Sequence, residues 1–91
     1  MRIERFQDLH ERYRRFAVSE SISANLTGVI EMLFSLPLIS APRISTQLGI
    51  TQPAARQHIK RLEDQGILER FQSSGRVHWY VAREILAAIE E

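Results

Sequence analysis

One face of a candidate helix at residues 52–65 collects side chains that can bind nucleic acid. Ala55, Ile59 and Leu62 are apolar and lie three or four residues apart, which marks the buried side of this helix. The opposite side carries a stripe formed by Gln52, Pro53, Arg56, Gln57 and Lys60. In the DNA major groove, arginine can donate two hydrogen bonds to guanine, and glutamine can pair with adenine. The stripe therefore predicts contact with double-stranded DNA.

Other side chains near this stripe are candidates for the DNA backbone. Lys60 and Arg61 can reach phosphates, and Arg43 lies near the start of the preceding helix. Phosphate contacts of this kind orient a protein without reading sequence. A hairpin further along can reach an adjacent groove or the backbone. The complete set of candidate DNA-contacting residues is Arg43, Thr51, Gln52, Pro53, Arg56, Gln57, Lys60, Arg61, Arg76 and His78.

The alternative is that this stripe is an ordinary solvated helix face, which is the simpler interpretation of each cation taken singly. The distribution of charge favours DNA, because no acidic residue occurs between Glu31 and Glu63. The net charge of the whole chain is nevertheless only +1. Since few cations neutralise few phosphates, a single copy should bind weakly. We therefore expect a homodimer or a larger host protein.

The elements around the stripe are predicted by local start and stop signals. Ser40 and Thr51 each stand two residues before a proline and are the expected N-caps of helices at 41–48 and 52–65. Gly49 supplies the left-handed residue that ends the first of these helices. Strands are expected at 67–71 and 77–81, with a hairpin tip at 72–76. This order predicts a winged helix-turn-helix, a mainly α fold with a small β-hairpin.

The rest of the chain supplies further helices. Helices are expected at 3–18, 23–35 and 83–90, with a strand stub at 38–39 and a break near 19–25. Gly28 lies inside the second helix and is expected to allow a close helix contact. We divide the chain into an N-terminal amphipathic helix at 1–22, acting as a linker or dimerisation segment, and a winged helix-turn-helix domain at 23–91.

The N-terminal helix carries one apolar stripe, for which two interpretations stay open. Its members are Phe6, Leu9, Tyr13 and Phe16. The stripe can fold back onto the domain core, or it can form a two-fold seam between copies, since its spacing suits helix pairing. These four residues are the candidate dimer interface.

The composition argues against several classes of function. The 91 residues contain no cysteine, which excludes thiol chemistry and weakly favours an intracellular, cytoplasmic setting. No apolar run approaches the roughly 18 residues that a membrane helix needs. His10, His58 and His78 are isolated from one another and are expected in ordinary surface or boundary roles, so we expect no metal and no cofactor. Without a Gly-rich phosphate loop or a Ser-His-Asp set, we expect no catalysis by this chain.

Two resemblances add to this interpretation. The run Leu-Gly-Ile-Thr-x-x-Ala-Ala-x-x-x-Ile-x-x-Leu-Glu-x-x-Gly-Ile-Leu at 48–68 resembles the winged helices of MarR-like and ArsR-like bacterial regulators. A wider pattern resembles the C-terminal winged-helix region of bacterial Fic-family proteins. It consists of Ile3-Glu4-Arg5-Phe6, Tyr13-Arg14, Leu-Phe-Ser-Leu-Pro-Leu-Ile-Ser at 33–40, the 48–68 run, and Val-Ala-Arg-Glu-Ile-Leu at 81–86.

The Fic resemblance implies a parent enzyme. In such proteins a preceding catalytic domain transfers a nucleotide, usually AMP, to a protein hydroxyl through a His-Pro-Phe-x-x-Gly-Asn-Gly-Arg loop. No part of this sequence matches that loop, so no catalytic residue is carried over. The chain would then be an accessory or regulatory domain, with a Fic catalytic domain in the same polypeptide as its partner. The resemblance leaves open whether the winged helix binds DNA or mediates dimerisation and docking without DNA.

Overall fold

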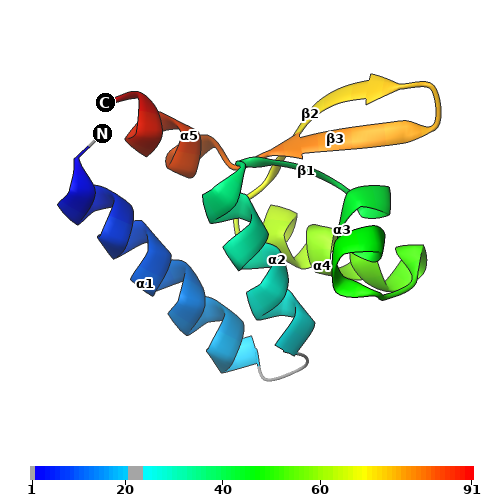
Figure 1. The fold of residues 1–91 in the computed structure, drawn as a ribbon, viewed down its shortest axis with the longest axis horizontal. Coiled ribbons are helices and arrows are strands. Elements are labelled where there is room, and N and C mark those ends of the chain that lie inside the picture. The colour runs from blue at the N-terminus through cyan, green and yellow to red at the C-terminus, as the bar shows by residue number, and fades with distance from the viewer. Residues whose placement is uncertain (1, 21–23) are drawn as a thin grey trace.

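The computed structural model describes residues 2–20 and 24–91, with the backbone alone described at residues 72–74. Within these ranges, helices and a small sheet follow one another along the chain (Figure 1). The elements are α1 (Ile3–Glu20), α2 (Ala24–Ser35), β1 (Leu38–Ser40), α3 (Ala41–Leu48), α4 (Gln52–Asp64), β2 (Glu69–Ser74), β3 (Val77–Val81) and α5 (Arg83–Glu90). The fold is mainly helical with a small antiparallel sheet, as the sequence predicted. Residues 21–23, where the sequence placed part of the break and the start of the second helix, lie outside the described residues.

The predicted caps position the two central helices. The Ser40 hydroxyl accepts a hydrogen bond from the Arg43 backbone N–H at 3.3 Å, and the Thr51 hydroxyl accepts one from the Ala54 N–H at 3.2 Å. Both bonds satisfy amides that have no partner inside the helix. Gly49 adopts φ 67°, the left-handed conformation expected of it, and its N–H donates to the Ser45 carbonyl at 3.0 Å. These three predictions are confirmed, and together they fix the turn between α3 and α4.

The sheet confirms the strand stub and the last strand, but it corrects the strand predicted at 67–71. Strand order is β1-β3-β2, and both pairings are antiparallel. The edge strand β2 runs from Glu69 to Ser74, so the hairpin turn between it and the central strand β3 is only Gly75 and Arg76. The backbone N–H groups of Ile67 and Leu68 donate to the Leu62 carbonyl at 2.9 and 3.2 Å. Because the end of α4 uses these amides, the two residues precede the ladder.

The core is built from side chains of every helix together with β1 and β3. Leu33, Ile39, Ile44, Leu62 and Ile85 are fully buried and come from different elements. Gly28 of α2 approaches α3 closely: a Cβ built at this residue would lie 3.2 Å from the Leu48 Cδ2 atom. This approach confirms the close helix contact predicted there. Among the described residues, no helix has both the length and the apolarity needed to cross a membrane.

The N-terminal stripe packs inside the chain, because α1 lies along α2 and reaches α5 (Figure 1). Leu9 and Tyr13 are each only 4% exposed, and Phe6 and Phe16 pack against the same core. The Phe34 ring of α2 makes edge-type contacts with the Phe6 and Tyr13 rings at centroid distances of 5.2 and 5.8 Å. Of the two alternatives for this stripe, the structure contains the first, in which the stripe folds back onto the domain core. A dimer seam through these side chains stays a prediction, and it requires α1 to leave the core.

Candidate nucleic-acid interface

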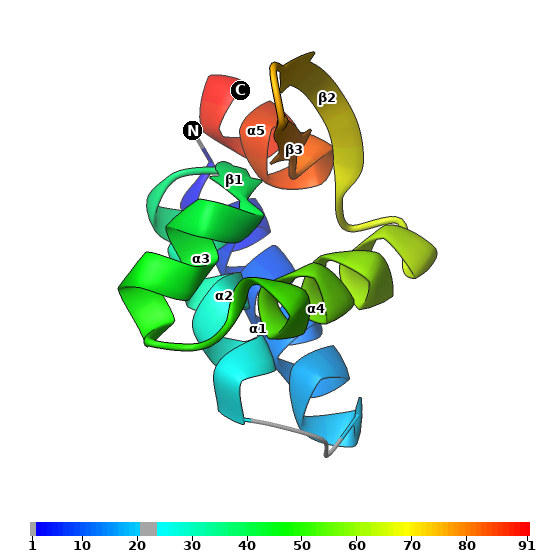
Figure 2. The ribbon, with the colours of Figure 1, turned by 90° about the vertical axis from the view of Figure 1, so that its right-hand side faces the viewer.

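Helix α4 presents one polar face to solvent and buries the other. Ala55, Ile59 and Leu62 are at most 2% exposed, as their spacing predicted. The five stripe residues Gln52, Pro53, Arg56, Gln57 and Lys60 are all exposed. In Figure 2, α4 runs across the face turned to the viewer, and the β2–β3 hairpin rises above it. We call this hairpin, residues 69–81, the wing. The stripe is therefore accessible along its length and is flanked by the wing.

Two cations of α4 are already paired with acidic groups of the same chain. The Lys60 Nζ atom lies 2.9 Å from an Asp64 carboxylate oxygen one turn further along the helix. The Arg61 Nη1 atom lies 3.2 Å from a Glu20 carboxylate oxygen at the end of α1. The hydrogen bond to Asp64, and then its negative charge, raises the pKa of the Lys60 ammonium above its ordinary value. Binding a phosphate with either cation would mean exchanging an internal partner.

Arg56 differs from these two cations. It is exposed, and it forms no ion pair within residues 2–20 and 24–91. Its side chain lines two hollows at once. One is an open, shallow surface on the outer face of α4, whose lining residues are Pro53, Arg56, Gln57, Lys60, Arg61 and Asp64. The other lies between α4 and the wing. Arg56 is thus the stripe residue at the boundary between the two surfaces.

The hollow beside the wing brings together residues that are distant in sequence. Its volume is about 70 Å³, and it is the more enclosed of the two. We call it the α4–wing pocket; it is lined by Ala41, Pro42, Gln52, Arg56, Ile59, Arg76, Val77, His78 and Tyr80. Four of the ten candidate DNA-contacting residues therefore meet here. Arg43 is exposed on α3 and Thr51 is used in capping α4, and neither lines either hollow.

His58 lies inside α4's buried side, although the sequence indicated a surface or boundary role. It is 8% exposed, and its Nδ1 atom has no hydrogen-bond partner in the described part of the chain. Burial, and then the nearby charge of Arg61, lowers the pKa of the His58 imidazole below its ordinary value. Its position three residues after Ala55 and four before Leu62 was the available signal for burial.

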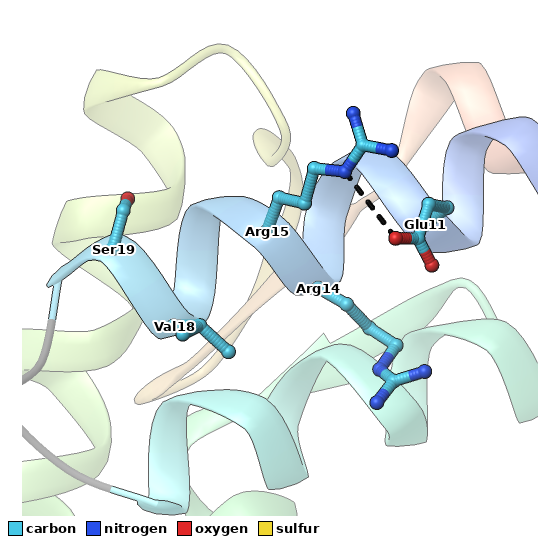
Figure 3. A pocket seen from close by; sticks show the side chains of 5 residues that line it. All are labelled: Glu11, Arg14, Arg15, Val18 and Ser19. Atoms are coloured by element: carbon cyan, nitrogen blue, oxygen red, sulfur yellow. Dashed lines mark hydrogen bonds and ion pairs between the residues drawn. The ribbon is translucent and has the colours of Figure 1, made fainter.

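A further hollow lies on α1 and does not join this interface. Glu11, Arg14, Arg15, Val18 and Ser19 line it, and all belong to one helix. Figure 3 shows the Arg14 and Arg15 side chains pointing apart, while Arg15 donates to Glu11 at 3.3 Å. Because the charged groups do not converge on a common point, this surface offers no defined binding geometry. The α4 face and the α4–wing pocket are the better candidates.

Comparison with known proteins agrees with this arrangement. Residues 28–69, from α2 to the first residue of β2, match a family described as winged helix-turn-helix DNA-binding. Reduced HlyU from Vibrio cholerae N16961 is similar in structure, with a TM-score of 0.56, 18% identity, and coverage of 92% of this chain and 88% of that chain.

The haem sensor protein PefR from Streptococcus agalactiae, solved in complex with haem, has a TM-score of 0.58 and 18% identity, and the match covers 97% of this chain and 68% of that chain. No curated protein sequence matches the chain significantly. The fold is a winged helix-turn-helix, and the family match supports a DNA-binding domain of this kind.

Proposed function

We propose that this chain binds double-stranded DNA by placing the exposed stripe of α4 in the major groove. The observation that carries this proposal is the division of α4 into an apolar buried side and a polar exposed side. A helix of 13 residues is about 20 Å long and fits a groove roughly 12 Å wide. In this proposal, Arg56 and Gln57 read base edges, and Lys60 contacts the backbone.

The charge of the interface sets the expected strength of binding. Arg43, Arg56 and Arg76 have no ion pair within the described residues, whereas Lys60 and Arg61 have one each. Each phosphate neutralised contributes about −0.9 to the slope of log affinity against log salt. With Arg56 on a base edge, the cations left for the backbone are Arg43, Arg76 and Lys60, which would give a slope of roughly −3 for one copy. Such a shallow slope means modest affinity, and we propose that a homodimer provides the additional contacts.

The test is a titration of the chain against random and genomic duplexes at about 50 mM salt, followed by fluorescence anisotropy. Gln57→Ala should reduce the preference among sequences, because a base contact is lost. Lys60→Ala should weaken binding to all duplexes alike. Gln7→Ala is the matched control for the glutamine, since Gln7 is exposed on α1. Absence of any binding at tens of micromolar protein would refute the proposal.

A narrower proposal concerns the parent protein. The residues that resemble the C-terminal region of Fic-family proteins extend over most of the chain. They support a role as the accessory domain of a cytoplasmic Fic-type adenylyltransferase, with the catalytic domain in the same polypeptide. The reading frame upstream of Met1 tests this directly. A His-Pro-Phe loop within a preceding domain is the expected result, and a frame that lacks such a domain would eliminate the idea.

A second candidate function is protein interaction without DNA. The internal pairing of Lys60 and Arg61 is the observation in its favour, because it removes two cations from the interface. In this alternative the chain dimerises through Phe6, Leu9, Tyr13 and Phe16, with α1 exchanged between copies. Sedimentation of the wild type and of Phe6→Glu, with circular dichroism to check folding, decides the matter. If both proteins are folded monomers at all concentrations, this alternative fails.

A further inference from the structure

The α4–wing pocket combines positive charge with an apolar floor. Arg56 of α4 and Arg76 of the wing turn both line it. Ile59 and Tyr80 are 2% and 8% exposed and form part of the floor. Within the described residues, no acidic side chain lines the pocket. Both arginines therefore border a partly enclosed space whose described lining residues supply no counter-ion.

The size of the pocket limits what can occupy it. At about 70 Å³ it has room for a few water molecules or one small anion. Pockets for cofactors and drug-sized ligands measure roughly 300–1,000 Å³. Guanidinium groups match the geometry of phosphate oxygens and can donate two parallel hydrogen bonds to them. A tetrahedral oxyanion therefore fits both the volume and the donors.

We propose that the α4–wing pocket binds a single phosphate group, held by Arg56 from the helix and Arg76 from the wing. When that phosphate belongs to DNA, the inference rests on the function proposed above. The backbone then passes between α4 and the wing, with its sugar against the apolar floor. In this arrangement Arg56 contacts the DNA backbone and fixes the register of α4 in the groove. This contact replaces the guanine contact that the position of Arg56 on α4 suggests.

The shared phosphate distinguishes this arrangement from two independent contacts. If both arginines bind one phosphate, removing the first also weakens the contact made by the second. The losses of binding free energy from the two substitutions then do not add. Charge-assisted hydrogen bonds are strong enough that each single substitution, Arg56→Ala or Arg76→Ala, should weaken duplex binding about tenfold. The double variant should then bind only two- to threefold more weakly than a single variant. Two independent contacts would instead make the double variant about a hundredfold weaker than the wild type.

The experiment has two arms. In the first, duplex affinity at about 50 mM salt is measured for the wild type, both single variants and the double variant. Arg14→Ala is the matched control, because Arg14 is exposed on α1 and lines neither α4 hollow. Arg76→Lys keeps the positive charge and should therefore bind more tightly than Arg76→Ala. In the second arm, the arginine Nε–Hε resonances are followed by NMR while inorganic phosphate replaces chloride at constant ionic strength.

The outcomes separate the sources of the phosphate and separate this inference from the proposed function. Non-additive losses support a DNA phosphate. Saturating shifts of Arg56 and Arg76, with Arg14 unmoved, support a free phosphate. If no duplex binds, the proposed function fails, and the NMR arm alone tests whether the pocket binds phosphate. Additive losses together with no phosphate-dependent shift overturn the inference while leaving DNA binding intact.

Discussion

If α4 binds DNA as proposed, replacing Asp64 with asparagine should strengthen binding, because this carboxylate would compete with phosphate for Lys60. The two side chains form an ion pair at 2.9 Å and are 60% and 73% exposed. Such an exposed pair is weak, but Lys60 must leave it to bind a phosphate, and the asparagine removes this competition. A carboxylate about 7 Å from a DNA phosphate also repels it by ~0.6 kcal/mol in water. Removing that repulsion alone corresponds to roughly threefold tighter binding, and the release of Lys60 from the ion pair adds to this gain.

The same substitution should leave the stability of the fold almost unchanged. Asp64 is the last residue of α4, where a negative charge interacts unfavourably with the helix dipole. Removing the charge therefore offsets the loss of the exposed ion pair. Thermal unfolding of Asp64→Asn should match that of the wild type within a few degrees. An increase in affinity then arises at the interface and not from a change in folding.

The assay is fluorescence anisotropy with one duplex at several salt concentrations. Asp8→Asn is the control, since Asp8 is exposed on α1 and its substitution makes the same change in net charge. We expect the effect of Asp64→Asn to shrink at high salt, because exposed charges are screened over about 8–10 Å at 0.1–0.15 M. Unchanged or weaker binding by Asp64→Asn, or an equal gain from Asp8→Asn, would refute the reasoning.

Three further predictions concern the scaffold. Gly49→Ala should lower the free energy of unfolding by about 1–2 kcal/mol in urea denaturation, because φ 67° is strained for a residue with a Cβ. Since burial lowers the pKa of His58, the unfolded chain binds this proton first, and stability should fall as pH drops below about 6.5. His58→Gln should lack this part of the pH slope, whereas exposed His78→Gln should keep it. Glu20→Gln breaks the 3.2 Å pair between α1 and α4 and should cost at most about 1 kcal/mol in the same assay.

The parts of the fold that sequence alone predicted are those set by neighbouring residues. Ser40, Thr51 and Gly49 each act within four residues, through a cap or a left-handed turn. The start of β2 was wrong because it depends on competition for the same amides. Ile67 is β-branched and Leu68 is apolar, so both suit a strand, yet their N–H groups are hydrogen-bonded to the end of α4. The strand propensity of a residue does not account for competition between two acceptors for the same backbone N–H group.

The candidate site divides in the same way. The stripe on α4 follows from helical periodicity, and the Lys60–Asp64 pair is also a local relation, one helical turn apart. In contrast, Arg61 meets Glu20 across 41 residues, and Arg56 shares a pocket with Arg76 only because the wing folds back over α4. Sequence spacing identifies which side chains are exposed on one element, whereas the α4–wing pocket is formed by α3, α4 and the wing together.

The stripe on α1 shows the limit of such patterns most clearly. Apolar residues at helical spacing indicate that one face of the helix is buried, but the same spacing is found in a core and in a dimer interface. What decides between them is the partner surface, here Phe34 of α2, which receives the Phe6 and Tyr13 rings. A dimer built on this stripe would have to replace those contacts with equivalent ones from a second copy. Exchange of α1 between copies satisfies that condition, because it preserves the contacts and changes only the chain that supplies them.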